Sequence, residues 1–164
     1  NENAGVGILG NFCPLFCHVH LHTHMTLEVQ YSLGNQLQIS DELKDKLYPY
    51  QVEGLEFFHD AIREGRKGVI LADEMGLGKS VQVISFLACM SKKQKIPSTL
   101  LIVPANLLDD WVTKIHEWTP WMTCLKYHQS EHHQAENLRK VKRKGGILVT
   151  TYETFVKRKE DLSS

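Results

Sequence analysis

Residues 69–80 combine glycines with a lysine and a hydroxyl side chain in an order suited to binding phosphate groups. The segment reads VILADEMGLGKS, in which Gly76 and Gly78 precede Lys79 and Ser80. Glycines let backbone N–H groups approach phosphate oxygens, a lysine neutralises the β- and γ-phosphates, and a serine hydroxyl is a ligand for Mg²⁺. The helix expected from Ser80 directs its unpaired N–H groups and positive dipole end at the same anion. The pattern therefore predicts a nucleotide-binding site with Mg²⁺.

The whole loop belongs to the candidate cofactor site. We assign Lys79 as the catalytic residue and Ser80 as the Mg²⁺ ligand. The cofactor-binding segment comprises Asp73, Glu74, Met75, Gly76, Leu77, Gly78, Lys79 and Ser80. Asp73 stands where the strict eight-residue pattern has its first glycine, so the alternative is a glycine-rich turn that binds nothing. An apolar strand before the loop and an apolar helix after it favour the phosphate interpretation.

The composition of the 164 residues is that of an ordinary globular protein. Hydrophobic residues make up 42% and charged residues 23% of the chain. No apolar stretch approaches the roughly 20 residues that a membrane helix needs, and no signal peptide is expected. Four cysteines are too few and too scattered for a disulfide framework, which favours a reduced, intracellular setting.

The net charge of zero conceals an uneven distribution of basic residues. All 19 of them follow residue 40, and two clusters lie at 139–144 and 157–159. Such clusters suit a nucleic-acid phosphate backbone. A solvated helix face is an equally good interpretation of the first cluster, where apolar residues mark only a narrow stripe.

Helices and strands are expected to alternate after residue 47. The expected helices begin at residues 49, 80, 106 and 131, and the expected strands are 69–72, 99–103, 124–127 and 147–149. Asn106 is the expected cap of the third helix. Strands that recur at this spacing are typical of βαβ units, so we predict an α/β fold with a parallel sheet. The phosphate loop then lies at the carboxyl end of its strand, where such sheets bind ligands.

The first 40 residues carry a different pattern. A run of one cysteine and four histidines comprises Cys17, His18, His20, His22 and His24. The histidines alternate, so in a strand they share one face, and a metal site is one interpretation. The alternative is a poorly defined N-terminal extension, since this spacing is not that of a zinc finger. Apolar alternation also predicts a small hairpin near residues 27–39.

Four segments, taken in order, resemble the motifs of a known family. Residues 47–55, 72–80, 101–106 and 148–153 are similar to the Q-like motif and motifs I, Ia and Ib of the SWI/SNF-type ATPases, a branch of the superfamily 2 helicases. Within that branch the segments look most like the Cockayne-syndrome-B-like and PICH-like members. The resemblance covers roughly residues 38–157, and it implies that residues 41–164 are a partial helicase ATP-binding domain, namely a P-loop NTPase lobe of the RecA-like type.

The resemblance also implies a function. Proteins of this kind are ATP-hydrolysing translocases on double-stranded DNA that act in chromatin remodelling or DNA repair in the nucleus. By the resemblance Gln51 contacts the adenine edge; the alternative is a solvent-exposed residue in the first turn of a helix. The residues that would face the DNA backbone are Pro104, Ala105, Asn106, Thr150 and Thr151. Thr150 and Thr151 are alternatively only strand formers that end a strand.

One expected motif is absent from the chain. Hydrolysis needs an acid on Mg²⁺ and a group that orients the attacking water, and in this family both come from an Asp-Glu-x-His motif. The 164 residues contain no such segment. We therefore expect an incomplete first lobe, a fragment that binds ATP weakly and does not hydrolyse it. Two alternatives remain at this point: an RNA helicase-type ATPase, and a truncated, non-catalytic interaction module.

Overall fold

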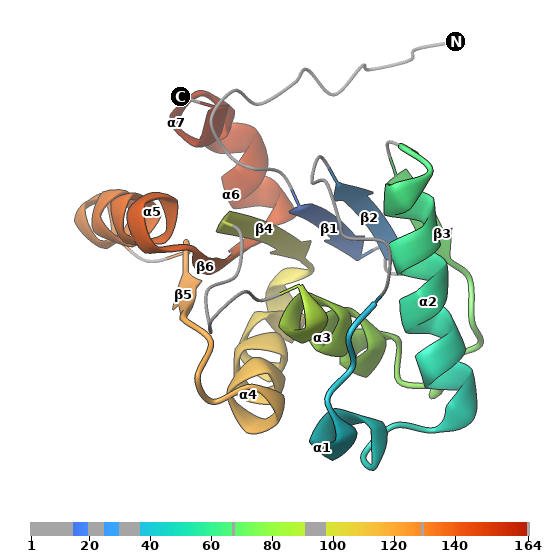
Figure 1. Cartoon of the computed structure of the whole chain (residues 1–164). Helices are drawn as coiled ribbons and strands as arrows, with labels where there is room; N and C mark the ends of the chain where they lie inside the picture. Colours follow the sequence, from blue (N-terminus) through green and yellow to red (C-terminus); the bar gives the residue numbers. More distant parts are fainter. Residues whose placement is uncertain are drawn as a thin grey trace, which may run out of the picture.

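The computed structural model describes residues 15–19, 25–29, 37–66, 68–90, 98–128 and 130–163, which form a six-stranded sheet covered by helices (Figure 1). The strands are β1 (Leu15–Val19), β2 (Met25–Val29), β3 (Gly68–Leu71), β4 (Ser98–Val103), β5 (Cys124–Lys126) and β6 (Gly146–Thr151). The helices are α1 (Asp41–Lys44), α2 (Pro49–Arg63), α3 (Lys79–Cys89), α4 (Leu108–Trp118), α5 (Glu131–Lys144), α6 (Tyr152–Lys157) and α7 (Lys159–Ser163), with a 3₁₀ turn, η1 (Ala105–Leu107). No helix within these ranges is long and apolar enough to cross a membrane.

The strand order is β3-β2-β1-β4-β6-β5. Strands β1, β4, β6 and β5 are parallel neighbours, whereas β2 is antiparallel to both β1 and β3. Strand β3 consequently runs in the same direction as β4 and β6, so their carboxyl ends meet at one edge of the sheet. The predicted α/β class with a parallel arrangement is confirmed, with β2 as its antiparallel exception among the described strands.

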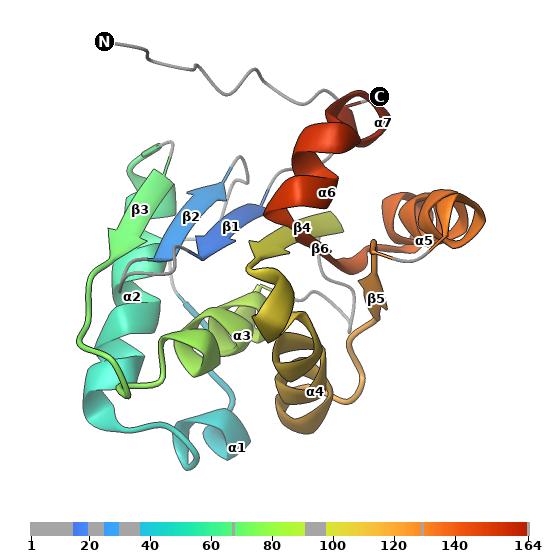
Figure 2. The ribbon, with the colours of Figure 1, turned by 180° about the vertical axis from the view of Figure 1, so that it is seen from behind.

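Each face of the sheet carries its own hydrophobic core. On one face, residues such as Leu101 and Val149 pack with the buried side chains of α2, α3 and α4. On the other, Leu100, Ile102 and Leu148 pack with the buried residues of α5 and α7. Figures 1 and 2 show α2, α3 and α4 on one side and α5, α6 and α7 on the other. Because neighbouring residues of a strand point to opposite faces, strands β4 and β6 contribute to both cores.

The N-terminal hairpin differs from the prediction. The antiparallel pair is formed by β1 and β2, and β2 also pairs with β3, so the expected hairpin over 27–39 is wrong in its second strand. Residues 37–40 form no strand; the half-buried Leu37 and Ile39 instead pack against the core beneath α2 and α3. Two segments of the expected extension thus lie inside the sheet. The metal interpretation concerned side chains of residues 17–24, all of which lie outside the described ones.

The start of α4 also differs from the prediction. Asn106 lies within η1, and Leu107 rather than Asn106 precedes the first residue of α4, with no side-chain cap. The N–H of Leu107 donates to the carbonyl oxygen of Pro104 at 2.9 Å, which closes a tight turn before the helix begins. Two acidic residues in the first turn, Asp109 and Asp110, complement the positive end of the helix dipole in place of a cap.

Candidate nucleotide-binding site

The loop between β3 and α3 turns at two glycines with left-handed backbone. Gly76 and Gly78 adopt positive φ values of 90° and 75°, and Gly78 is the residue from which α3 begins. A left-handed residue at this point turns the chain so that the first N–H groups of the helix face the loop. Gly78 meets a second constraint, because a Cβ there would lie 2.5 Å from Nε2 of Gln51. The loop therefore depends on glycine both for its turn and for its contact with α2.

Lys79 lies across the loop that it follows. Its Nζ donates to the carbonyl oxygens of Asp73 at 2.5 Å and Glu74 at 2.7 Å. The ammonium group is thus held among backbone oxygens at the position expected for a phosphate-binding lysine. Carbonyl groups are weaker partners for an ammonium ion than phosphate is, so an incoming triphosphate can take their place.

Ser80 has a neighbour that the sequence pattern did not reveal. The Nζ of Lys114, on α4, donates to the Ser80 hydroxyl oxygen at 3.4 Å. A second cation thus lies beside the residue predicted to bind Mg²⁺, and it suits the negative charge of a triphosphate. The two residues are 34 positions apart, and only the packing of α4 against α3 brings them together.

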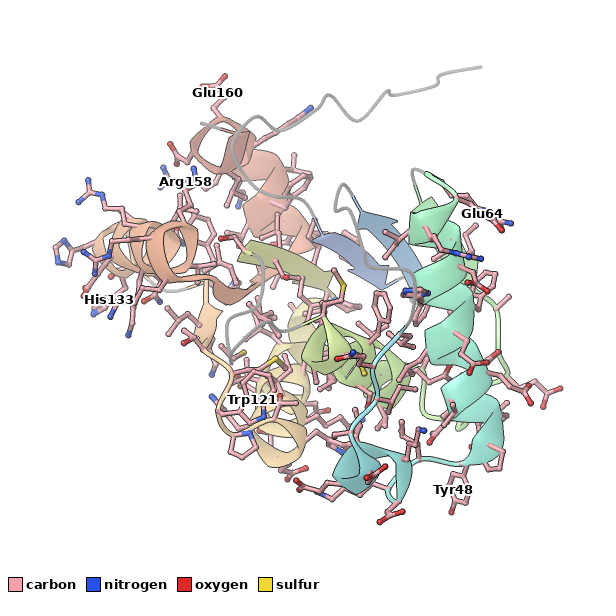
Figure 3. All side chains as sticks on the ribbon, viewed as in Figure 1. Tyr48, Glu64, Trp121, His133, Arg158 and Glu160 are labelled. Carbon is pink, nitrogen blue, oxygen red and sulfur yellow. The ribbon has the colours of Figure 1, made fainter. Side chains whose placement is uncertain are left out.

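Gln51 connects α2 to the same loop. Its side chain is buried, with Oε1 accepting from the Tyr48 N–H at 3.1 Å and Nε2 donating to the Leu77 carbonyl at 3.2 Å. The first bond belongs to the cap of α2, and the second holds the phosphate loop. Gln51 is therefore not a solvated first-turn residue, unlike Tyr48, which Figure 3 shows at the start of α2 pointing away from the molecule. Its contact with adenine stays a prediction.

The candidate DNA-facing segments lie together at the carboxyl edge of the sheet. In the β4–β6 register Val103 is opposite Thr151, so the turn at 104–106 and the end of β6 are adjacent. Ala105 and Asn106 are exposed, whereas Pro104 is buried. Because β3 is parallel to these strands, the phosphate loop is at the same edge.

The two threonines of that set are engaged within the protein. Thr150 is fully buried, and its hydroxyl donates to the Tyr127 carbonyl at 2.8 Å. The hydroxyl of Thr151, which is also buried, accepts from the N–H of Thr154 at 3.3 Å and caps α6. Of the candidate DNA-facing set, Ala105 and Asn106 are thus the residues open to a ligand in this structure.

Cys89, which is half-buried, and Cys124, which is buried, are chemically quiet. Burial raises the pKa of Cys89 to about 11 and that of Cys124 to about 12. Both thiols consequently stay protonated at neutral pH, and the thiolate is the reactive species. We expect iodoacetamide at pH 8 to modify neither thiol in the folded chain, with peptide mass spectrometry as the readout.

The control for this prediction is the unfolded chain. In denaturant both cysteines should return to ordinary reactivity and be alkylated within the same period. Modification of Cys124 in the folded chain at the unfolded rate would contradict the burial described here. Because the pKa values are raised by folding, their contribution to stability is present below about pH 9 and lost as the pH rises further.

Together, the fold and the loop define a class of protein. A glycine-containing loop that joins a strand of a parallel sheet to a helix beginning with Lys-Ser is the phosphate-binding loop of P-loop nucleotide-binding proteins. Comparison with known families gives the particular branch: the SNF2-related domain matches residues 50–164, and the chain belongs to that family. The expected relation to the SWI/SNF-type ATPases is confirmed.

Similar proteins carry names from the same branch. The chain is 43% identical over 129 residues to the "DNA excision repair protein ERCC-6-like" of Danio rerio and 40% identical over 124 residues to its Homo sapiens counterpart, covering 78% and 75% of this chain. It is 34% identical over 120 residues, or 71% of its length, to the Rattus norvegicus "SWI/SNF-related matrix-associated actin-dependent regulator of chromatin subfamily A containing DEAD/H box 1". These matches cover only 9%, 10% and 12% of the relatives' own lengths.

A solved structure supports the fold. The Sulfolobus solfataricus SWI2/SNF2 ATPase core in complex with dsDNA matches with a TM-score of 0.55 at 24% identity, over 77% of this chain and 25% of that one. The likeness places the sheet and its helices in the fold of an SNF2 ATPase core. The predicted RecA-like lobe is confirmed at this level.

Proposed function

We propose that the chain binds Mg-ATP in its phosphate loop and is the ATP-binding part of an ATP-dependent translocase on double-stranded DNA. The observation that carries the proposal is the Lys79 ammonium held inside a loop of two positive-φ glycines at the start of a buried helix. Membership of the SNF2-related family and relatives named for excision repair and chromatin regulation support a role in DNA repair or chromatin remodelling in the nucleus.

The residues present fit the cofactor. Lys79 and Lys114 supply positive charge on two sides of the loop, and the Ser80 hydroxyl is a ligand of the kind that Mg²⁺ takes. Lys79 would hold the β- and γ-phosphates in place of its two carbonyl partners, while Gln51 keeps the loop against α2 and would contact the base. Bound Mg²⁺ supplies charge neutralisation at the phosphate oxygens.

We propose further that these 164 residues bind ATP without turning it over. The sequence holds no Asp-Glu-x-His segment, and phosphoryl transfer needs carboxylate groups that hold Mg²⁺ and orient water. Exposed Ala105 and Asn106, at the same sheet edge as the loop, are the proposed contacts with the DNA backbone. The similar Sulfolobus solfataricus ATPase core was solved in complex with dsDNA, which is consistent with a duplex substrate here.

The test is thermal unfolding of the purified chain with and without millimolar Mg-ATP, beside Lys79→Ala. A ligand at 100 times its dissociation constant adds about 2.7 kcal/mol to the free energy of unfolding, so an upward shift of Tm is expected. Lys79→Ala should abolish the shift while leaving the Tm without ligand almost unchanged, because the hydrogen bonds of Lys79 described here are to carbonyls of the loop and not to the core. Equal shifts in both chains would overturn the proposed site, and ATP turnover lost in Lys79→Ala would overturn the proposal of binding without hydrolysis.

A further inference from the structure

The side chain of Gln82 is a buried polar group. It lies on α3 and is fully buried. Its Nε2 donates to Oδ2 of Asp73 at 2.8 Å, while its Oε1 has no hydrogen-bond partner among the described residues. A buried amide with an unsatisfied oxygen disfavours the folded state, and an apolar side chain of the same length would suit this position better. Stability therefore does not account for glutamine at this position.

A glycine on the facing helix accommodates the same amide. Gly54 is in the interior of α2, where glycine is less favourable than alanine. A Cβ at this position would collide with Oε1 of Gln82 and lie 3.0 Å from its Cδ. Since Gln82 is fully enclosed, its amide has little room to move aside. Gly54 and Gln82 are each unfavourable for folding. One requirement explains both, namely the hydrogen bond from the Gln82 amide to Asp73.

Asp73 is the point at which this amide meets the phosphate loop. Its carbonyl oxygen accepts from Lys79 and its carboxylate accepts from Gln82, so α3 holds this loop residue at two places. A carboxylate that is free to swing beside a triphosphate repels it, and here a carboxylate stands where the strict pattern has glycine. The neutral amide of Gln82 restricts the Asp73 carboxylate to one orientation.

We propose that Gln82 is a positioning residue of the nucleotide site, whose amide holds the Asp73 carboxylate so that the loop keeps its phosphate-accepting shape. The inference rests on the proposed function and adds a residue to it. Gln82 touches no phosphate itself; it acts through Asp73, and Gly54 provides the space in which it does so.

The first test is Gln82→Met, which removes the amide and nearly keeps the length of the side chain. The Tm of the ligand-free chain should stay the same or rise, because removal of the unsatisfied buried oxygen offsets loss of the hydrogen bond to Asp73. The Kd for Mg-ATP, measured by isothermal titration calorimetry, should increase about tenfold, the order expected for one hydrogen bond to a charged group. If the role of Gln82 were purely structural, Gln82→Met would lower the Tm of the ligand-free chain, and any increase in Kd would accompany that loss of stability.

The second test is a double-mutant cycle between α2 and α3. Gly54→Ala should displace the Gln82 amide and weaken Mg-ATP binding about as much as Gln82→Ala does. In a chain that already carries Gln82→Ala, adding Gly54→Ala should have no further effect on Kd, because the group it collides with is gone. Glu56→Ala, an exposed residue of the same helix, is the matched control and should bind as the unchanged chain does.

The outcomes separate this inference from the proposed function. If the unchanged chain binds Mg-ATP, Lys79→Ala does not, and Gln82→Met binds with the original Kd, the inference is overturned and the proposed function stands. Additive effects of Gly54→Ala and Gln82→Ala would likewise overturn it. If the unchanged chain fails to bind Mg-ATP, the proposed function is overturned and this inference with it.

Discussion

Gly78→Ala is expected to destabilise the folded chain by about 1–3 kcal/mol, the cost of holding a side chain in left-handed backbone. It should also abolish most nucleotide binding. The residue has a φ of 75°, and the added Cβ would meet Nε2 of Gln51 at 2.5 Å. Gln51 is buried, so the collision is relieved by breaking its bond to the Leu77 carbonyl. The loop then loses both its turn and its attachment to α2.

Two other glycines provide matched controls for Gly78→Ala. Gly65 and Gly76 have φ values of 72° and 90°, and nothing lies within 4 Å of a Cβ built on either. Gly65→Ala should show the backbone strain alone, and Gly76→Ala the strain within the loop. Urea unfolding and calorimetric titration with Mg-ATP on all three variants give the comparison. Equal losses of affinity at 76 and 78 would contradict a specific role for the Gln51 contact.

Phe86→Ala is expected to lower the free energy of unfolding by about 3–5 kcal/mol, the range for removing a buried aromatic side chain. Phe86 is fully buried on α3, and its ring lies 5.3 Å from the ring of Phe58 on α2. The contact joins the helix that begins at the phosphate loop to the helix that carries Gln51. A cavity here therefore removes transfer free energy and loosens the packing of the two helices that build the site.

Phe57→Ala is the control for the core prediction. Phe57 neighbours Phe58 on the same helix but is 41% exposed, so its removal should change stability by less than about 1 kcal/mol. Guanidinium unfolding followed by circular dichroism measures both variants. Similar losses for Phe57→Ala and Phe86→Ala would show that the core does not lie between α2 and α3.

The phosphate loop was predictable because its parts are contiguous in the chain. Strand, glycines, lysine and helix follow one another over residues 69–80, and the structure keeps that order at the carboxyl end of β3. The contacts that support the loop were not predictable in the same way. Lys114 reaches Ser80 across 34 positions, and Gln51 reaches Leu77 across 26, through the packing of helices whose relative placement periodicity does not specify.

The misplaced hairpin has a physical origin as well, and so does the unexpected burial of the threonine pair, whose contact with DNA stays a prediction. Apolar alternation over 27–39 is equally compatible with a strand partner that follows or one that precedes, and the structure pairs β2 with β1 and β3. At the end of β6, a strand-forming threonine pair does not reveal that every residue of the strand is buried. Leu148, two residues earlier on the same face of the strand, packs with α5 and α7, and the pattern of the strand alone does not show that helices cover this face.

The central strands of the sheet are packed on both faces, whereas its edge strand is partly exposed. Strands β4 and β6 lie between two hydrophobic cores, whereas β3 is the first strand of the sheet order and leaves Ile70 58% exposed. Resistance to local opening follows burial and hydrogen bonding, so we expect the amide protons of β4 and β6 to exchange last and those of β3 early in a hydrogen-exchange measurement.

The phosphate loop follows β3 at the edge of the sheet, whereas the turn at 104–106, with Ala105 and Asn106 exposed, follows the central strand β4. A ligand bound in the loop is therefore expected to reduce the mobility of the less protected edge of the sheet. The turn at 104–106 ends a well-packed central strand, so its position is expected to change little when the loop binds a ligand.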